Sequence, residues 1–335
     1  MTVLDAIQKS TEFLAKKGVE SPRLQTELLL AHLLKMPRMK LYLNFDRTLT
    51  PAETDGLREL IKRRGQREPL QHIIGSTSFC GLEIAVNRHV LVPRPETELL
   101  AEEGWFFLNR LSEGRITRAP GHNEASEIGD SYDSSFRALD LGTGSGCIAI
   151  ALAVKCPSAK ITATDISIDA LALAKENAMR NGVAAKIDFL NGDGFSALQP
   201  EVQIAPEGRI TRVPDSNIDM RASQSSSLQN LEFDLIVSNP PYIPSAEIAT
   251  LQPEVRDFDP RMALDGGPDG LDFYRILASR AKSFLKPKGK MMVEFGDGQA
   301  EAVGNVFEVE KWIVESVKED YSHRARILTA TIKLR

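Results

Sequence analysis

The sequence has 335 residues, of which 42% are hydrophobic and 26% charged, and its formal net charge is -5. This length and mixture suffice for about two ordinary domains, each with a hydrophobic core that needs no disulfide or metal. The acidic balance argues against a protein whose main task is to grip nucleic-acid backbone, since such domains usually carry a basic excess.

The three cysteines, Cys80, Cys147 and Cys156, are odd in number and form no CxxC pair. We therefore expect neither a disulfide framework nor a structural zinc site. Residues 1–11 lack the basic start and apolar run of a secretory signal, and no stretch approaches the roughly 18 apolar residues that span a bilayer. These features indicate a cytoplasmic protein that does not associate with membranes.

Residues 1–75 are predicted to form a helical domain. Ser21-Pro22 is typical of a helix N-cap followed by proline at the first helical position. Thr50-Pro51-Ala52-Glu53 matches a capping box, and the helix that it begins should stop at Gly65. The cations just before that glycine, residues 62–64, are interpreted as a solvated helix end.

Residues 76–92 are predicted to form a β-hairpin linker with its turn near Asn87-Arg88. The proline-punctuated segment that follows, residues 92–98, leads into an apolar helix over residues 99–107. We expect residues 93–335 to form the second domain.

That second domain alternates strands and helices, which predicts an α/β fold with a doubly wound, mostly parallel sheet. The best helix runs from Ile168 to Asn181, with Ser167 as its N-cap. The candidate strands are residues 137–141, 160–165, 186–190, 233–238, 290–295 and 327–333. Two segments rich in Ser, Asn, Asp, Gly and Pro, residues 112–136 and 200–230, are predicted to be flexible surface insertions. Their alternative role is a pair of basic loops that touch a ribosomal or RNA partner.

A glycine-rich turn follows the first candidate strand of this domain. Its residues are Gly142, Thr143, Gly144, Ser145 and Gly146. Such a turn needs backbone angles that side chains disfavour, and its bare backbone lets a bulky cofactor approach. The next strand ends at Asp165, whose carboxylate could accept both hydroxyl hydrogens of a ribose diol.

The third strand ends in the segment Asn191-Gly192-Asp193-Gly194-Phe195. Asp193 could accept an adenine amino hydrogen, and the Phe195 ring could lie against the adenine. A NAD-binding turn usually has the spacing GxGxxG, whereas the third glycine here comes one residue early. This spacing resembles that of class I S-adenosylmethionine-dependent methyltransferases, and it indicates S-adenosylmethionine as the cofactor.

The fourth candidate strand ends in Asn239-Pro240-Pro241-Tyr242, where ligands bind in sheets of this kind. An amide nitrogen is a poor nucleophile, because its lone pair is delocalised into the carbonyl. Two acceptors, the Asn239 side-chain oxygen and the Pro240 carbonyl, could hold both N–H hydrogens and free that lone pair. Both contacts would strengthen as positive charge builds on nitrogen during transfer. The prolines stiffen the turn, and Tyr242 offers a ring face to a flat substrate group.

The motif leaves the substrate open, because adenine, guanine and cytosine amino groups and glutamine amides are all planar nitrogens with two hydrogens. The chemistry requires neither a metal nor a covalent nucleophile. Two rivals therefore stand beside amide methylation: a nucleic-acid amino methyltransferase, and a non-catalytic cofactor-binding module. The acidic balance counts against the first rival, and the intact Asn-Pro-Pro-Tyr motif counts against the second.

The chain resembles the bacterial PrmC/HemK family of release factor glutamine methyltransferases over nearly its whole length apart from the two insertions. Besides Asn-Pro-Pro-Tyr, four segments carry the resemblance: residues 67–75, 90–98, 254–256 and 265–275. The Pro-Arg-Pro-Glu-Thr-Glu run within residues 90–98, joined to Asn-Pro-Pro-Tyr, is much more specific than the glycine turn.

The resemblance implies a helical N-terminal domain that helps recognise a class I release factor, and a seven-stranded methyltransferase domain whose last strand is antiparallel. It implies that the substrate is the glutamine of the factor's Gly-Gly-Gln loop, with no direct nucleic-acid partner. The glycine turn and Asp165 would bind the cofactor, and Asn239 would touch both cofactor and substrate. Gly194 departs from the family pattern, because relatives often place a large aromatic residue there against the adenine.

Overall fold

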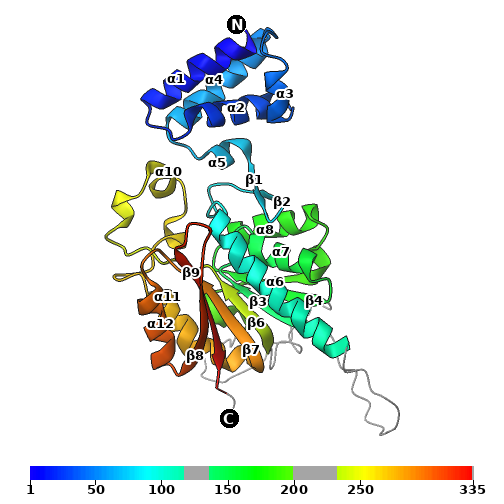
Figure 1. The fold of residues 1–335 in the computed structure, drawn as a ribbon, viewed down its shortest axis with the longest axis vertical. Helices are drawn as coiled ribbons and strands as arrows, with labels where there is room; N and C mark the ends of the chain where they lie inside the picture. The colour runs from blue at the N-terminus through cyan, green and yellow to red at the C-terminus, as the bar shows by residue number, and fades with distance from the viewer. Residues whose placement is uncertain (117–135, 199–231, 334–335) are drawn as a thin grey trace, which may run out of the picture.

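The computed structural model describes residues 1–116, 136–198 and 232–333. The predicted insertions at 112–136 and 200–230 therefore lie almost entirely outside the described residues. Figure 1 shows a small helical domain joined through a hairpin to a larger α/β domain. Among the described residues, no helix is long and apolar enough to cross a membrane.

Five helices make up the first 75 residues. They are α1 (Val3–Lys16), α2 (Pro22–Leu33), α3 (Arg38–Tyr42), α4 (Pro51–Gly65) and α5 (Leu70–Ile74). The capping box at Thr50 is confirmed, because its hydroxyl accepts from Glu53 N and the Glu53 carboxylate accepts from Thr50 N. Ser21, in contrast, has a φ of 45° and makes no side-chain cap, so only the proline half of that prediction is right. Leucines and isoleucines of these helices form a core of their own.

The linker is a two-stranded hairpin, β1 (Ser76–Phe79) paired antiparallel with β2 (Leu82–Ala85). Its turn is Cys80-Gly81, with φ values of 51° and 77°, and not the predicted Asn87-Arg88. A two-residue turn of this kind needs positive φ at both positions, which glycine adopts easily. Asn87 forms a separate turn just after the hairpin, where its side-chain oxygen accepts from His89 N.

The α/β domain is built on a seven-stranded sheet in the order β5-β4-β3-β6-β7-β9-β8. The strands are β3 (Phe136–Leu141), β4 (Ala159–Asp165), β5 (Ile187–Asn191), β6 (Phe233–Ser238), β7 (Leu285–Glu294), β8 (Trp312–Glu319) and β9 (Ala325–Ile332). All six predicted strands are present, and β9 runs antiparallel to both neighbours, as the resemblance implied. The unpredicted strand, β8, lies at the sheet edge and is half exposed, so it lacks a long apolar run.

Helices cover both faces of this sheet, which confirms the doubly wound fold. They are α6 (Pro95–Ile116), α7 (Cys147–Lys155) and α8 (Ile168–Arg180) on one face, and α11 (Asp272–Arg280) and α12 (Ala300–Val309) on the other (Figure 1). Neighbouring residues of a strand point to opposite faces of the sheet. Leu235 packs in the core between the sheet and α6, α7 and α8, whereas Ile236 packs in the core between the sheet and α11 and α12. The short elements are α10 (Pro253–Arg256), η1 (Ala184–Lys186), η2 (Gly194–Leu198), η3 (Ile248–Thr250), η4 (Arg261–Ala263) and η5 (Ala281–Phe284).

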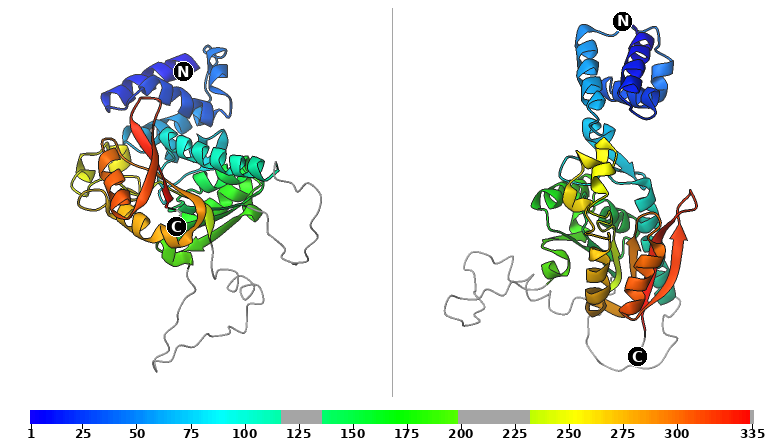
Figure 2. Two further views of the ribbon diagram at one scale, coloured as in Figure 1. Left: turned by 60° about the horizontal axis from the view of Figure 1, so that its bottom comes forward. Right: turned by 90° about the vertical axis from the view of Figure 1, so that its left-hand side faces the viewer.

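The helical domain stands at one end of the α/β domain, and the two further views in Figure 2 agree on this arrangement. Besides the hairpin, the segment that contains α10 lies close to the junction between the domains (Figures 1 and 2). This segment follows strand β6 and its Asn-Pro-Pro-Tyr motif in the sequence. The connection after β6 therefore reaches from the sheet to the helical domain.

Candidate active site

The candidate site lies where the chain direction within the sheet reverses. From β3 the chain moves outward through β4 and β5, and then returns to β6 on the other side of β3. Loops that leave β3 and β6 must diverge, which opens a crevice at the carboxyl ends of these strands. Leu141 and Ser238 are partners in the register, and Ser238 Oγ donates to the Leu141 carbonyl at 2.8 Å. The glycine turn and Asn239 therefore start side by side.

The glycine turn is tied to the neighbouring strand by its own backbone. Gly142 N and Thr143 N both donate to the Thr164 carbonyl at 2.9 Å. Gly144 N donates to Asp165 Oδ2 at 2.8 Å. The turn and the predicted ribose carboxylate are thus joined directly, although they are far apart in the sequence.

The glycines of this turn serve different purposes. A Cβ added to Gly142 or Gly144 would meet no atom within 4 Å, so both backbones border open space. A Cβ on Gly146 would lie 3.0 Å from the Ala174 Cβ, so this glycine allows helix α8 to approach closely. An open, bare backbone at the start of a helix fits the close approach of a nucleoside cofactor.

A buried asparagine, which the sequence analysis missed, supports the turn from behind. Asn177 of α8 is fully buried, and its Nδ2 donates to the Ser145 carbonyl at 2.9 Å. The same side chain exchanges hydrogen bonds with both backbone groups of Ala85, at the end of the hairpin. The sequence signal for this role was an asparagine on the apolar face of a predicted helix, beside Ala174 and Ala178. Asn177 thus links the hairpin, helix α8 and the glycine turn.

Asp140 lies beneath the turn and is fully buried. Its Oδ2 accepts from Thr143 Oγ1 at 2.6 Å and from Ala149 N at 3.1 Å, so it joins the turn to helix α7. Burial raises the pKa of Asp140 to about 7, although these two hydrogen bonds act in the opposite direction.

This raised pKa predicts a pH-dependent stability. The folded state holds the proton more tightly than the unfolded state, so the contribution of Asp140 is fully present below pH 3.8 and is lost as the pH rises to about 7. In chemical unfolding at several pH values, the stability of wild type relative to Asp140→Asn should therefore decline between those limits. Asn keeps an acceptor for Thr143 and Ala149 but cannot ionise. A constant difference would contradict the raised pKa.

Asp165 is half-buried at the end of β4. Its Oδ2 accepts from Gly144 N and its Oδ1 from Ser167 N at 2.9 Å. Each carboxylate oxygen can accept a further hydrogen bond, so the geometry leaves capacity for a hydroxyl pair. Asp193 is exposed in the loop after β5.

The prediction for Phe195 is wrong. Its ring is fully buried and stacks on Phe284, with the centroids 5.1 Å apart and the planes at 12°. A ring enclosed by the core has no face left for an adenine. Gly194 has a φ of 53°, where a large side chain would be strained, and the space beside it is open. The aromatic residue of the family pattern is therefore not replaced by Phe195.

The Asn-Pro-Pro-Tyr turn carries two unused acceptors. Asn239 is half-buried, and its Nδ2 donates to Thr97 Oγ1 at 3.0 Å. Among the residues that the structure describes, neither the Asn239 side-chain oxygen nor the Pro240 carbonyl accepts a hydrogen bond. Tyr242 is half-buried, and burial raises the pKa of its phenol, so it stays neutral.

The late loop, residues 265–275, holds this turn in place. Ile243 N donates to the Leu264 carbonyl at 3.0 Å, and Gly266 N donates to the Ile243 carbonyl at 2.9 Å. A Cβ on Gly266 would lie 2.8 Å from the Tyr242 Cα, so only glycine permits this approach. Gln299 Nε2 also donates to the Tyr242 carbonyl at 2.9 Å. The Asn-Pro-Pro-Tyr turn and the late loop, which are separate motifs in the sequence, therefore form one structural unit.

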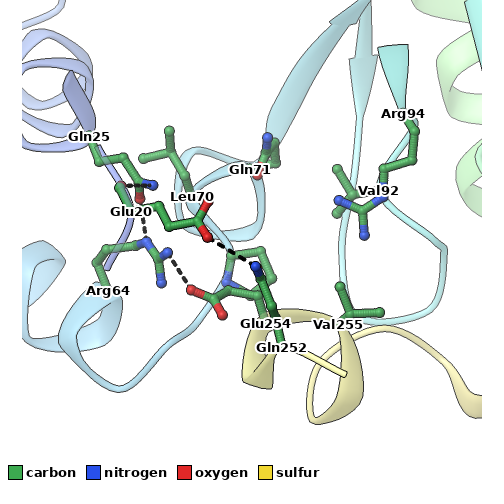
Figure 3. A pocket seen from close by; sticks show the side chains of 11 residues that line it. Glu20, Gln25, Arg64, Leu70, Gln71, Val92, Arg94, Gln252, Glu254 and Val255 are labelled. Carbon is green, nitrogen blue, oxygen red and sulfur yellow. Dashed lines mark hydrogen bonds and ion pairs between the residues drawn. The ribbon is translucent and has the colours of Figure 1, made fainter. Parts of the chain in front are cut away.

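Glu254 joins the helical domain to the loop that follows the turn. Its carboxylate accepts from Arg64 Nη2 at 2.6 Å and from Arg67 Nε and Nη2 at 2.6 and 2.5 Å. Arg64 is buried, so the prediction of a solvated basic helix end is wrong for this residue. A second contact runs from Gln252 Nε2 to Glu20 Oε1 at 3.0 Å. Figure 3 shows the contacts of Glu254 with Arg64 and of Gln252 with Glu20, beside a pocket lined by residues of both domains.

Comparison with known proteins places these features in a family. Two family models match, the PrmC N-terminal domain over residues 5–75 and the methyltransferase small domain over residues 130–204. The chain is 41% identical over 306 residues to the release factor glutamine methyltransferase of Geobacter sulfurreducens, covering 91% of this chain and 88% of the relative. It is 39% identical over 301 residues to that of Chlorobaculum tepidum, covering 90% and 87%. Among solved structures it resembles ribosomal protein L11 methylase from Lactobacillus delbrueckii subsp. bulgaricus, with a TM-score of 0.40, 17% identity, and coverage of 71% and 79%.

Proposed function

Because the chain belongs to the family of release factor glutamine methyltransferases, we propose that it methylates the side-chain amide nitrogen of a release-factor glutamine. The cofactor of this reaction is S-adenosylmethionine, which supplies an electrophilic methyl group when bound. We place the substrate glutamine in the Gly-Gly-Gln loop of class I release factors, as the resemblance implies.

The observation that carries the proposal is the pair of free acceptors on a rigid turn. A glutamine NH2 group has two hydrogens and a lone pair delocalised into its carbonyl. If Asn239 Oδ1 and the Pro240 carbonyl each accept one hydrogen, the lone pair is left to face the methyl donor. The hydrogen bonds of Ile243 and Gly266 fix the turn before substrate arrives, so little reorganisation is needed during transfer.

We assign the remaining substrate contacts to Pro241 and Tyr242. The half-buried Tyr242 ring offers a flat apolar face to the planar amide. Because its phenol stays neutral, the ring adds no negative charge that would compete for the amide hydrogens. The substrate is therefore held by two acceptors and one ring face.

We assign cofactor binding to the crevice formed by the ends of β3, β4, β5 and β6. The bare backbones of Gly142 and Gly144 support this assignment, as does the remaining acceptor capacity of Asp165. The residues assigned are Gly142, Thr143, Gly144, Ser145, Gly146, Asp165, Asp193, Gly194 and Asn239.

Replacing Asp165 by alanine should weaken cofactor binding by about 10- to 100-fold, because hydrogen bonds to a charged group contribute roughly 1.5–3 kcal/mol each. Calorimetric titration with S-adenosylmethionine measures the effect. Asp169→Ala is the matched control, since that carboxylate is exposed nearby on α8 and makes no contact with the turn. Equal affinities for the two variants would remove Asp165 from the cofactor site.

We assign recognition of the intact release factor to the helical domain at residues 1–75. The match of residues 5–75 to the PrmC N-terminal domain supports this role. The contact between Glu254 and the arginines of the helical domain also supports this role. The contact connects the helical domain to the loop after the Asn-Pro-Pro-Tyr turn, which we call the catalytic turn. A factor bound by the helical domain would thus lie near the turn that receives its glutamine.

Incubation of the protein with a purified class I release factor and S-adenosylmethionine tests the function. Tandem mass spectrometry should find a mass gain of one methylene on the loop glutamine, and none on a factor in which that glutamine is alanine. Parallel incubations with DNA, ribosomal RNA and transfer RNA test the nucleic-acid alternative. Methyl transfer to nucleic acid without transfer to the factor would overturn the proposal, and transfer to nothing would favour a binding module.

A further inference from the structure

Two buried polar side chains outside the assigned site, Thr97 and Glu294, lie close to the Asn239 amide. Thr97 comes from the first turn of α6, and its Oγ1 accepts from Asn239 Nδ2 at 3.0 Å. Glu294 ends strand β7, and its carboxylate is close enough to Thr97 and Asn239 for both side chains to lower its pKa. Thr97 is 3% exposed and Glu294 is 2% exposed. A carboxylate this deeply buried is costly unless it gains hydrogen bonds in return.

The buried carboxylate bears on the direction of the hydrogen bond between Thr97 and Asn239. An ionised carboxylate only accepts, and a threonine hydroxyl has one hydrogen to donate. Glu294 Oε2 has no hydrogen-bond partner among the described residues, so the carboxylate has capacity to take the Thr97 hydrogen. Once that hydrogen is committed, Thr97 Oγ1 can only accept, and Asn239 must turn its Nδ2 toward it.

We propose that Glu294 and Thr97 act as positioning residues that fix which end of the Asn239 amide faces the substrate. With Nδ2 held by this pair, Oδ1 is left for the substrate NH2 group. The flipped amide would place Oδ1 against the threonine and the carboxylate, and would confront the substrate hydrogens with another NH2 group. The inference deepens the proposed function and rests on it, because it concerns the same acceptor.

The protonation state of Glu294 should make turnover depend on pH. Burial raises the pKa of Glu294 to about 7, and the neighbouring polar groups of Thr97 and Asn239 act in the opposite direction. A protonated Glu294 can donate to Thr97, which frees the threonine hydrogen to meet Asn239 Oδ1 instead. The orientation of the amide is then no longer determined. Turnover should therefore fall as the pH drops below about 7.

The other charged or titratable groups around Glu294 come from three elements and one loop. Glu96 of α6 raises its pKa and Arg326 of β9 lowers it. Tyr242 of the catalytic turn and Tyr274 of α11 also face it, and the pKa of each phenol is raised by burial, so both stay neutral. Arg326 is paired with Asp320 at 3.0 Å. We assign the change at the Asn239 amide near neutral pH to Glu294, because Asp140, whose pKa is also raised to about 7, contacts Thr143 and Ala149 and not this amide.

Steady-state kinetics on Thr97→Val and Glu294→Gln tests the proposal. Each variant should lower kcat by about 10- to 100-fold, the loss expected from one misdirected hydrogen bond. KM for the release factor and Kd for S-adenosylmethionine should stay within about threefold, because the binding surfaces are untouched. Thr97→Ser, which keeps the hydroxyl, should restore most of the turnover. The acid limb of the wild-type pH profile should be absent in Glu294→Gln.

Thr329→Val is the matched control for Thr97→Val. Thr329 is a buried threonine of strand β9 outside the residues assigned to binding or catalysis, so the change tests buried isosteric substitution alone. Thermal unfolding of each variant shows whether it is folded. A Thr97→Val enzyme with a kcat within about twofold of the Thr329→Val enzyme would overturn the proposal.

A second measurement does not depend on catalysis. The side-chain NH2 protons of Asn239 give two resonances in nitrogen-edited NMR spectra, and the hydrogen-bonded proton should shift with a midpoint near pH 7 in wild type. The shift should be absent in Glu294→Gln, and resonances that do not titrate in wild type would overturn the proposal. If wild type methylates no release factor, the proposed function fails, but this titration still decides the role of Glu294 and Thr97.

Discussion

Replacing Asn239 by alanine should lower kcat by roughly 10²–10³-fold, the loss seen when one aligned hydrogen-bond partner is removed from a transition state. The Pro240 carbonyl would then hold a single hydrogen of the amide, and the nitrogen could rotate away from the methyl donor. The backbone that carries Asn239 should keep its place, because the strand register and the late loop hold it. Single-turnover kinetics with a saturating release factor measures the methyl-transfer step itself.

Cofactor affinity separates a catalytic loss from a structural one. Kd for S-adenosylmethionine should change by less than about tenfold in Asn239→Ala, since the glycine turn and Asp165 supply the other assigned contacts. Asn109→Ala is the matched control, because within the described part of the chain this asparagine of α6 makes a single long hydrogen bond, 3.4 Å to the Lys155 carbonyl. An Asn239→Ala enzyme as active as this control would remove the residue from the chemistry.

The parts of the site that could be predicted from the sequence are those formed by residues close together in the chain. The glycine turn needs bare backbone at fixed spacing, and two prolines beside Asn239 stiffen one turn. Alternating strands and helices place both at carboxyl ends of strands, so the chain itself determines that they meet. The structure confirms that they start from partner positions on β3 and β6.

The supporting residues could not be predicted, because each acts through an element distant in the sequence. Thr97 lies within a segment that the sequence singled out, but its hydrogen bond to Asn239 spans 142 residues. Glu294 follows the apolar run Met291, Met292 and Val293 at the end of β7, and nothing local shows which amide it approaches. The signal in both cases was a polar side chain at a position that should be buried. Burial alone does not identify the partner.

Phe195 shows why an aromatic residue near a predicted site is hard to interpret. A ring beside the end of a strand suits an adenine and a hydrophobic core equally well, since both offer apolar contact. The choice depends on Phe284, which is distant in the sequence but supplies a stacking partner in the core. Core packing therefore determines the position of this ring, and the open space beside Gly194 was not visible from the sequence.

Loss of the contact between Glu254 and the two arginines, Arg64 and Arg67, should also lower activity on the intact release factor strongly. Burial alone would raise the pKa of Glu254, but hydrogen bonds from Arg67 and Arg64 outweigh it and bring the pKa below its usual range. The carboxylate is thus ionised at neutral pH, and its stabilising contribution is lost only as the pH falls below the ordinary glutamate range. The Arg64 side chain is only 4% exposed, and among the described residues its ion pair is with Glu254 (Figure 3).

Glu254→Gln should therefore destabilise the junction by about 3 kcal/mol, because it leaves a buried guanidinium without its counterion. If the helical domain binds the release factor, kcat/KM for the intact factor should fall by about 10- to 100-fold. Turnover on a short Gly-Gly-Gln peptide, which cannot reach the helical domain, should change far less. Comparing the two substrates measures how much the junction contributes to presentation of the glutamine.

Asp257→Asn provides the matched control for that comparison. Asp257 lies at the end of the same short helix and pairs with Arg256, but both side chains are more than 40% exposed, so their pair should contribute little. Equal losses on factor and peptide in Glu254→Gln would mean that the carboxylate supports the catalytic turn and not the placement of the helical domain. Loss confined to the intact factor, and absent from Asp257→Asn, would make the junction the element that couples recognition to the turn carrying Asn239.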